Sequence, residues 1–130
     1  MLDEWIALPD RLEKATDRET VHHILAANLV ASNMILAALG AEGHDFDWSW
    51  LIPDEEWTAR LGYKDVPVDP ALELFRALTK YFSTLLARDP SLLQRTIRLR
   101  DSGSSEPYSI TVAEILAREV DHAKEHLAKT

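Results

Sequence analysis

The stretch that decides the fold is T-V-A-E-I-L-A-R-E-V-D-H-A-K-E-H-L-A-K-T, residues 111–130. Thr111 followed three residues later by Glu114 is a capping box, in which each side chain satisfies a free backbone N–H at the start of a helix. Apolar residues then recur at helical spacing and form one stripe: Val112, Ile115, Leu116, Ala123 and Leu127. The stretch therefore predicts an amphipathic helix that begins after Thr111 and packs this stripe against a core.

Two histidines, His122 and His126, lie on the same stripe. They are four residues apart, so on a helix their rings share one face, about one turn from each other. Two imidazoles placed in this way can bind one divalent metal ion, and a third histidine from another helix would complete a site with an open position. A histidine on an apolar face is also often a hydrogen-bonded core residue, so the pair alone leaves a structural role open.

Length and composition restrict the classes of protein. The chain has 130 residues, which predicts a single domain over residues 1–130. Its formal net charge of −8 disfavours binding to nucleic acid through a basic patch. The absence of cysteine excludes disulfides, thiolate zinc sites and cysteine catalysis, and it fits a reducing compartment. The acidic start M-L-D-E-W-I lacks the basic residues of a signal peptide, so we expect a cytoplasmic protein. Because of the net negative charge, we expect no nucleic-acid partner.

Hydrophobic periodicity predicts three further helical segments. Two long helices are expected over residues 17–39 and 70–88, and residues 3–14 predict a short helix that is broken at Pro9. No segment alternates over a useful strand length, and residues 96–110 are expected to form an exposed hairpin-like loop. With the closing helix, these segments predict an all-α, up-down four-helix bundle.

The first long helix is expected to lie at the centre of the bundle. It follows a second capping box, Thr16 with Glu19, and from Val21 to Ala41 it carries no formally charged residue, a length near that of a membrane span. Five polar side chains lie in this stretch: His22, His23, Asn28, Ser32 and Asn33. A span tolerates few such groups, so we expect a helix surrounded by other helices and no membrane partner.

Residues 40–69 link the two long helices and are expected to be irregular, with a short helix over residues 54–61. Aromatic residues crowd this segment: Phe46, Trp48, Trp50, Trp57 and Tyr63. A loop this aromatic is expected to fold over the bundle as a long crossover, and part of it could wall a pocket above a metal ion.

The start of the first long helix offers the third metal ligand, at His22 or His23. Adjacent helical residues point about 100° apart, so only one of them can easily join the pair on the closing helix. Because that first helix is apolar on nearly every side, periodicity does not choose between them. Glu119 is the candidate for orienting a ligand or transferring a proton.

Two other interpretations compete with a three-histidine site. Glu19 with His22, and Glu119 with His122, are both Glu-x-x-His pairs, and two such pairs with two further helix glutamates hold two irons in ferritin-like bundles. Another helix supplies Glu73, but the sequence shows no second inward glutamate. In the second alternative the bundle is non-catalytic and its histidines are structural.

The order of these segments resembles the DinB/YfiT-like superfamily over about residues 16–129. V-H-H-I-L-A at residues 21–26 resembles the family's V-H-H-x-A-D segment, and the closing H-A-K-E-H-L-A resembles its H-x-x-x-H-L-A ending. L-I-P-D-E-E-W at residues 51–57, L-G-Y at 61–63 and P-A-L-E-L-F-R-A-L at 70–78 resemble its middle segments. The chain departs from the family where L-A-A-N replaces A-D-S-H after the histidine pair, and where R-L-R-D-S-G lacks a histidine before the closing helix.

The resemblance implies a four-helix bundle, often a homodimer, with one zinc or nickel ion held by three histidines. Residue by residue, the ligands fall on His23, His122 and His126, so the resemblance favours His23 over its neighbour. Some members of the family transfer a low-molecular-weight thiol to an electrophile, and others are proposed metal-dependent hydrolases. The resemblance thus implies a metal-dependent enzyme that activates a thiol or a water molecule toward a small-molecule substrate, with Glu119 as the candidate catalytic residue.

Overall fold

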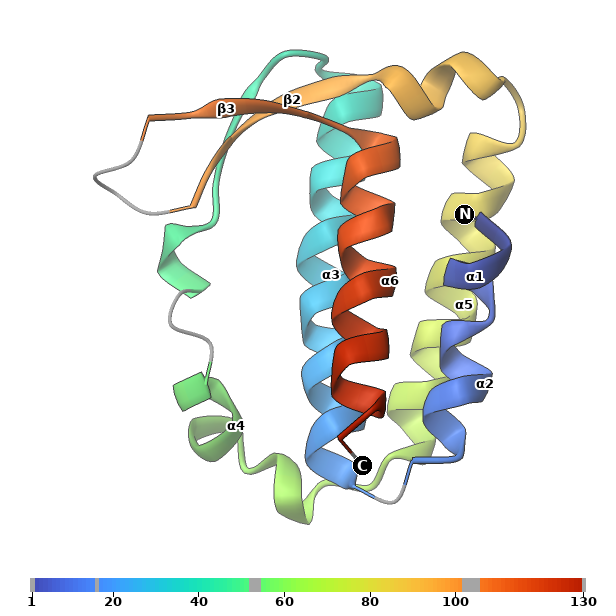
Figure 1. Cartoon of the computed structure of the whole chain (residues 1–130), viewed down its shortest axis with the longest axis vertical. Helices are drawn as coiled ribbons and strands as arrows, with labels where there is room; N and C mark the ends of the chain where they lie inside the picture. Colours follow the sequence, from blue (N-terminus) through green and yellow to red (C-terminus); the bar gives the residue numbers. More distant parts are fainter. Residues whose placement is uncertain (1, 16, 52–54, 102–105, 130) are drawn as a thin grey trace.

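The computed structural model describes residues 2–15, 17–51, 55–101 and 106–129. Four helical columns pack side by side, and a small sheet lies beside one end of the bundle (Figure 1). The first column is split at its middle into two short helices, and the other three are continuous. The helices of the bundle are α1 (Leu2–Ile6), α2 (Leu8–Glu13), α3 (Arg18–Gly40), α5 (Asp69–Leu86) and α6 (Val112–Leu127).

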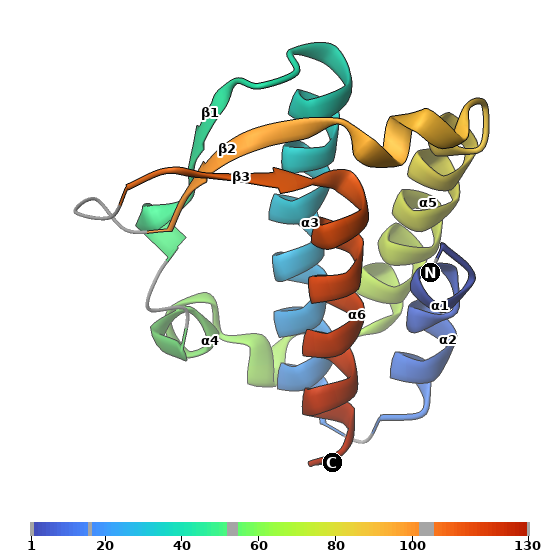
Figure 2. The ribbon, with the colours of Figure 1, turned by 45° about the horizontal axis from the view of Figure 1, so that its top comes forward.

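The chain direction in the bundle is set by a long crossover. The crossover runs back along the outside of the bundle, so α3 and α5 are parallel, whereas α2 and α6 run the opposite way (Figures 1 and 2). It carries four short elements: β1 (Asp45–Asp47), η1 (Ser49–Leu51), α4 (Glu55–Leu61) and η2 (Tyr63–Asp65). The predicted four-helix bundle with a long crossover is therefore confirmed, and its up-down alternation is interrupted where the crossover makes α3 and α5 parallel.

A three-stranded sheet was not predicted. β2 (Thr96–Arg100), which follows the 3-10 helix η3 (Pro90–Gln94), pairs in parallel with β1 and antiparallel with β3 (Tyr108–Thr111). Ile97 and Leu99 point into the core and alternate with the exposed Arg98, so the expectation of no useful strand was wrong. The alternating pattern of β2 is only five residues long. One of its partner strands, β1, lies in the crossover, far away in the sequence. The expected hairpin is formed by β2 and β3, and Ser102–Ser105 lie outside the described residues.

Two of the long helices, α3 and α6, begin at side-chain caps. At α6 the predicted capping box is present: Glu114 N donates to Thr111 Oγ1 at 3.0 Å, and Thr111 N donates to Glu114 Oε1 at 3.2 Å. At α3 the capping residue is Asp17, whose Oδ1 accepts from Glu19 N at 3.0 Å. The sequence had indicated Thr16, which lies outside the described residues.

The central helix α3 packs against α5 and α6. By length and composition α3 could cross a membrane, and 44% of its most apolar 18-residue window is buried in the described structure. Its one fully buried amide, Asn28, is satisfied on both sides. Trp5 Nε1 donates to Asn28 Oδ1 at 2.8 Å, and Asn28 Nδ2 donates to the carbonyl of Ile24 at 2.8 Å. Asn28 thus joins α3 to α1 inside the core.

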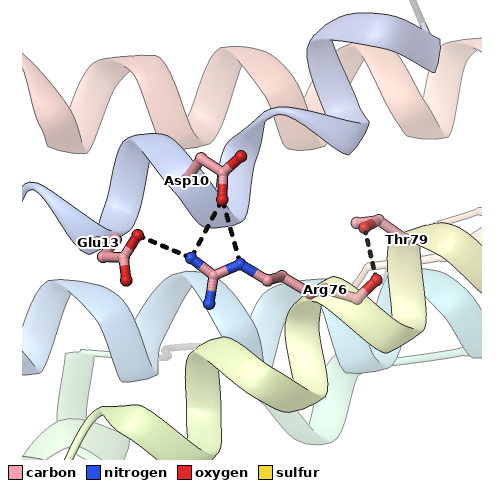
Figure 3. A network of polar contacts seen from close by, with 4 residues as sticks. All are labelled: Asp10, Glu13, Arg76 and Thr79. Atoms are coloured by element: carbon pink, nitrogen blue, oxygen red, sulfur yellow. Dashed lines mark hydrogen bonds and ion pairs between the residues drawn. The ribbon is translucent and has the colours of Figure 1, made fainter.

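An arginine fastens the split column to α5 (Figure 3). Arg76 Nε donates to Asp10 Oδ1 at 3.1 Å, and Arg76 Nη2 donates to Glu13 Oε2 at 2.8 Å. Thr79 Oγ1 donates to the carbonyl of Arg76 one turn earlier, at 3.2 Å. All three charged side chains are largely exposed, so water weakens these ion pairs. They orient α2 on α5, while the buried residues supply most of the stability.

Candidate metal centre

Three histidines from two helices meet on the crossover side of the bundle. His23 comes from the first turns of α3, and His122 and His126 come from the last turns of α6, which runs antiparallel to it. Each offers one ring nitrogen, and these nitrogens all lie within 4.8 Å of one another. The structure thus brings together the three residues that the resemblance indicated.

The spacing of these nitrogens fits a shared divalent metal ion. His23 Nε2 and His122 Nε2 are 3.2 Å apart. Two nitrogens bound tetrahedrally to zinc, each at the usual metal–nitrogen distance, are about 3.3 Å apart. The three ring centroids are 4.6–5.0 Å from one another, and the rings are steeply inclined to each other. Neutral imidazoles are borderline donors that suit zinc, nickel and copper, so the donor set fits such an ion.

The neighbouring His22 faces a different part of the molecule. Its Nε2 lies 3.0 Å from the carbonyl oxygen of Val66, and its ring stacks on Tyr63 with centroids 5.1 Å apart. His22 is therefore buried against η2 and does not join the cluster. The choice that periodicity left open is made by the rotation of α3, which turns His23 toward α6.

The carboxylates needed for a two-iron site are not assembled. Because His22 points to η2, the pair Glu19 and His22 faces away from the pair on α6. Glu73 is exposed on α5. Within the described ranges, the group of potential ligands that comes together consists of three histidines and no carboxylate. This geometry favours one metal ion.

A pocket of about 290 Å³ opens beside the histidines, between the crossover and the helices α3 and α6. Its outer wall comes from the crossover, through Trp48, Trp57 and Tyr63. His23 and His122 line its inner wall, together with small residues of α3 and two charged residues of α6. A ligand in this pocket would therefore lie against the imidazoles and be covered by aromatic rings.

Glu119 lies in this pocket, one turn before His122 on α6. The side chain as a whole is partly exposed, but its Oε1 is buried and has no hydrogen-bond partner within the described part of the chain. This burial raises the pKa of Glu119 to about 8, although the positive charge of Arg118 acts in the opposite direction. At neutral pH the carboxyl therefore keeps its proton in this environment and can donate it.

The small sheet positions two residues of the pocket, Trp48 and Arg118, of which only Trp48 was expected from the sequence. Asp101 follows β2 and accepts hydrogen bonds from Trp48 Nε1 and, at 2.8 Å, from the hydroxyl of Tyr108. Arg118 Nη1 donates to the same hydroxyl at 2.9 Å. Arg118 lies four residues before His122, so helical spacing alone could have placed it on the histidine face. Trp48 and Arg118 thus reach the pocket from opposite sides, joined through Tyr108 and Asp101.

No family model matches the sequence, and no curated protein matches it. Among solved structures, YfiT from Bacillus subtilis superposes on this chain with a TM-score of 0.80, covering 98% of this chain and 79% of that one at 17% sequence identity. The chain has the YfiT fold. YfiT is described as a probable metal-dependent hydrolase with an unusual four-helix bundle topology. The YfiT fold confirms the resemblance at the level of architecture.

Proposed function

We propose that the protein binds one divalent metal ion, zinc or nickel, through His23, His122 and His126, and uses it as an enzyme on a small-molecule substrate. The observation that carries this proposal is that three imidazoles bring ring nitrogens within 4.8 Å of one another, while two of them, His23 and His122, line a pocket. A structural metal site is closed by four protein ligands, whereas three ligands leave a position for a reactant. The pocket lies next to that position.

A divalent ion in this site supplies Lewis-acid chemistry, since it lowers the pKa of a coordinated water or thiol and so provides a nucleophile near neutral pH. The rest of the chemistry belongs to the chain. Trp48, Trp57 and Tyr63 exclude bulk water from one side of the substrate. In the metal-free protein the pKa of Glu119 is about 8, and a nearby cation lowers it, so with the ion bound Glu119 can take up a proton from the nucleophile and return it to the leaving group.

Two nucleophiles suit this arrangement. Activated water would make the protein a hydrolase, which is the activity suggested for YfiT. A low-molecular-weight thiol would make it a thiol S-transferase, as the family resemblance implies. We place hydrolysis first because it needs one organic substrate in a pocket of only about 290 Å³, whereas thiol transfer needs two.

The test is the metal content of protein purified without a histidine tag or chelator. We expect about one zinc or nickel per chain, lost in His23→Ala and in His126→Ala. His22→Ala is the matched control, because it removes an adjacent imidazole that contacts Val66 and Tyr63 instead of the cluster. Metal that survives in His23→Ala and His126→Ala, or about two irons per chain, would overturn the proposal.

Catalysis is tested separately with Glu119→Gln. The variant should retain the metal, because Glu119 is not among the three ligands. It should lose hydrolysis of a panel of aryl esters and lactones by roughly 100-fold or more, the usual contribution of a positioned group that transfers a proton. If the metal-loaded wild type turns over neither this panel nor a thiol with an aryl electrophile, the histidines serve a non-catalytic metal site.

A further inference from the structure

The pocket beside the histidines contains a positive charge that the proposed chemistry does not use. Arg118 is exposed on α6 and lines the pocket one turn before His122. Residues four apart on a helix have Cβ atoms roughly 6 Å from each other. A group bound by Arg118 would therefore lie within the span of one small molecule from the proposed metal position.

One neutral residue, Tyr108, holds this arginine in place. Its Nη1 donates to the Tyr108 hydroxyl at 2.9 Å, and its guanidinium carbon lies 5.4 Å from the centroid of the same ring. Other arginines of the chain face carboxylates directly, such as Arg76 with Asp10 and Arg98 with Asp45. No ion pair between Arg118 and a carboxylate occurs among the described residues. Its charge is therefore oriented by contacts that do not neutralise it.

A guanidinium has five N–H donors, of which the hydroxyl of Tyr108 accepts one. A carboxylate matches the planar fork of the remaining donors and can accept two parallel hydrogen bonds. The apolar wall formed by Trp48, Leu51 and Trp57 favours a ligand with one charge over a doubly charged phosphate, because each buried charge costs desolvation free energy.

We propose that Arg118 binds the carboxylate of the substrate, so that the site selects small, largely apolar molecules that carry one carboxylate group. This inference rests on the proposed function, because it uses the same pocket. It assigns Arg118 to substrate selection, with Tyr108 as a positioning residue that holds the guanidinium at the pocket wall. The reacting group of the substrate then lies toward the histidines and its carboxylate toward the sheet.

The test compares two probes that differ only in charge, 3-phenylpropionate and 3-phenylpropionamide. Binding is measured at pH 7, below the pKa of about 8 of Glu119, by calorimetry and by tryptophan fluorescence, since Trp48 and Trp57 line the pocket. We expect Arg118→Gln to weaken the carboxylate by roughly tenfold to a hundredfold, as loss of a charge-assisted hydrogen bond does, and to leave the amide within about twofold. Arg118→Lys should recover part of the affinity because it restores the charge without the fork.

Arg98→Gln is the matched control, because it removes an exposed arginine of β2 that pairs with Asp45 and does not line the pocket. It should leave both affinities unchanged. All titrations use the full chain as purified and again after chelator treatment, with the metal content measured in each preparation. If the purified protein contains no metal, the proposed function is contradicted. The comparison of the two probes still tests the role of Arg118 in that case.

Four outcomes would overturn the assignment of Arg118. The first is no binding of 3-phenylpropionate to the wild type at millimolar concentration, and the second is equal losses of both probes in Arg118→Gln. The third is a preference for the carboxylate that disappears on chelation and survives in Arg118→Gln, which would place the carboxylate on the metal. The fourth is tighter binding of 2-phenylethylphosphonate than of the carboxylate.

Discussion

Replacing Glu119 by Gln should change how the stability of the metal-free protein depends on pH. Burial raises the pKa of Glu119 from the ordinary 4.5 to about 8 in the folded protein. Below pH 4.5 the carboxyl is protonated in both states. As the pH rises above 4.5, Glu119 ionises in the unfolded chain but stays protonated in the folded protein. The free energy of unfolding therefore falls between pH 4.5 and pH 8. One pKa unit corresponds to about 1.36 kcal/mol, which gives a loss of about 3 kcal/mol by pH 7 and about 4 kcal/mol by pH 8, where Glu119 is half ionised in the folded protein as well.

The assay is urea unfolding of chelator-treated protein, followed by far-ultraviolet circular dichroism at pH 5, 6, 7 and 8. The glutamine cannot ionise, so the stability of Glu119→Gln relative to wild type should rise by about 1.4 kcal/mol per pH unit across this range. Burying the amide of Gln changes the free energy of unfolding by an amount that does not depend on pH. All five histidines are present in both proteins, so their effects cancel. The test is therefore the slope of the stability difference against pH.

Glu73→Gln provides the comparison, because Glu73 is exposed on α5 and away from the pocket. Its stability relative to wild type should stay within about 0.5 kcal/mol at every pH, as for most surface substitutions. Parallel curves for wild type and Glu119→Gln would refute the reasoning, since they would show that the carboxyl titrates alike in the folded and unfolded states.

The other predictions concern metal binding and the joints of the fold. Zinc binding at pH 7 should release about one more proton from wild type than from Glu119→Gln, because a nearby cation favours the ionised carboxylate; calorimetry in buffers of different ionisation enthalpy measures this. Asn28→Ala should cost about 2 kcal/mol in urea unfolding, because the buried indole N–H of Trp5 loses its acceptor. Arg76→Ala should lower the urea midpoint only slightly, and less at 1 M salt, because its ion pairs are exposed to water. Thr111→Ala should cost about 1 kcal/mol through the lost cap of α6, and an unchanged urea midpoint would count against that cap.

The parts of the fold that local sequence controls could be predicted. The closing helix begins after Thr111 because the capping box is made by residues three apart, and His122 and His126 share a face because helical geometry places them there. The long helices were placed to within a few residues for the same reason. Helix ends fray, and bounds of this kind vary by one or two residues.

The parts that depend on distant contacts could not be predicted. The rotation of α3 about its axis decides whether His22 or His23 faces α6. The ring of His22 contacts the carbonyl of Val66, which is far along the chain. The sheet was missed because β2 is short and its parallel partner, β1, lies in the crossover. The hydrogen bonds that link Arg118 to Trp48 follow from the register of that sheet, so the pocket's positive charge was missed with it.

In this fold the candidate metal ligands and the aromatic wall of the pocket come from different segments of the chain. The three histidines stand on α3 and α6, which the bundle core holds rigidly, whereas the aromatic wall of the pocket belongs to a connecting segment on the outside of the bundle. Connecting segments tolerate exchange far better than the packed elements they join. If the proposed metal centre is confirmed, grafting crossovers of different sequence between α3 and α5 should diversify its substrates, which makes this bundle a scaffold for directed evolution.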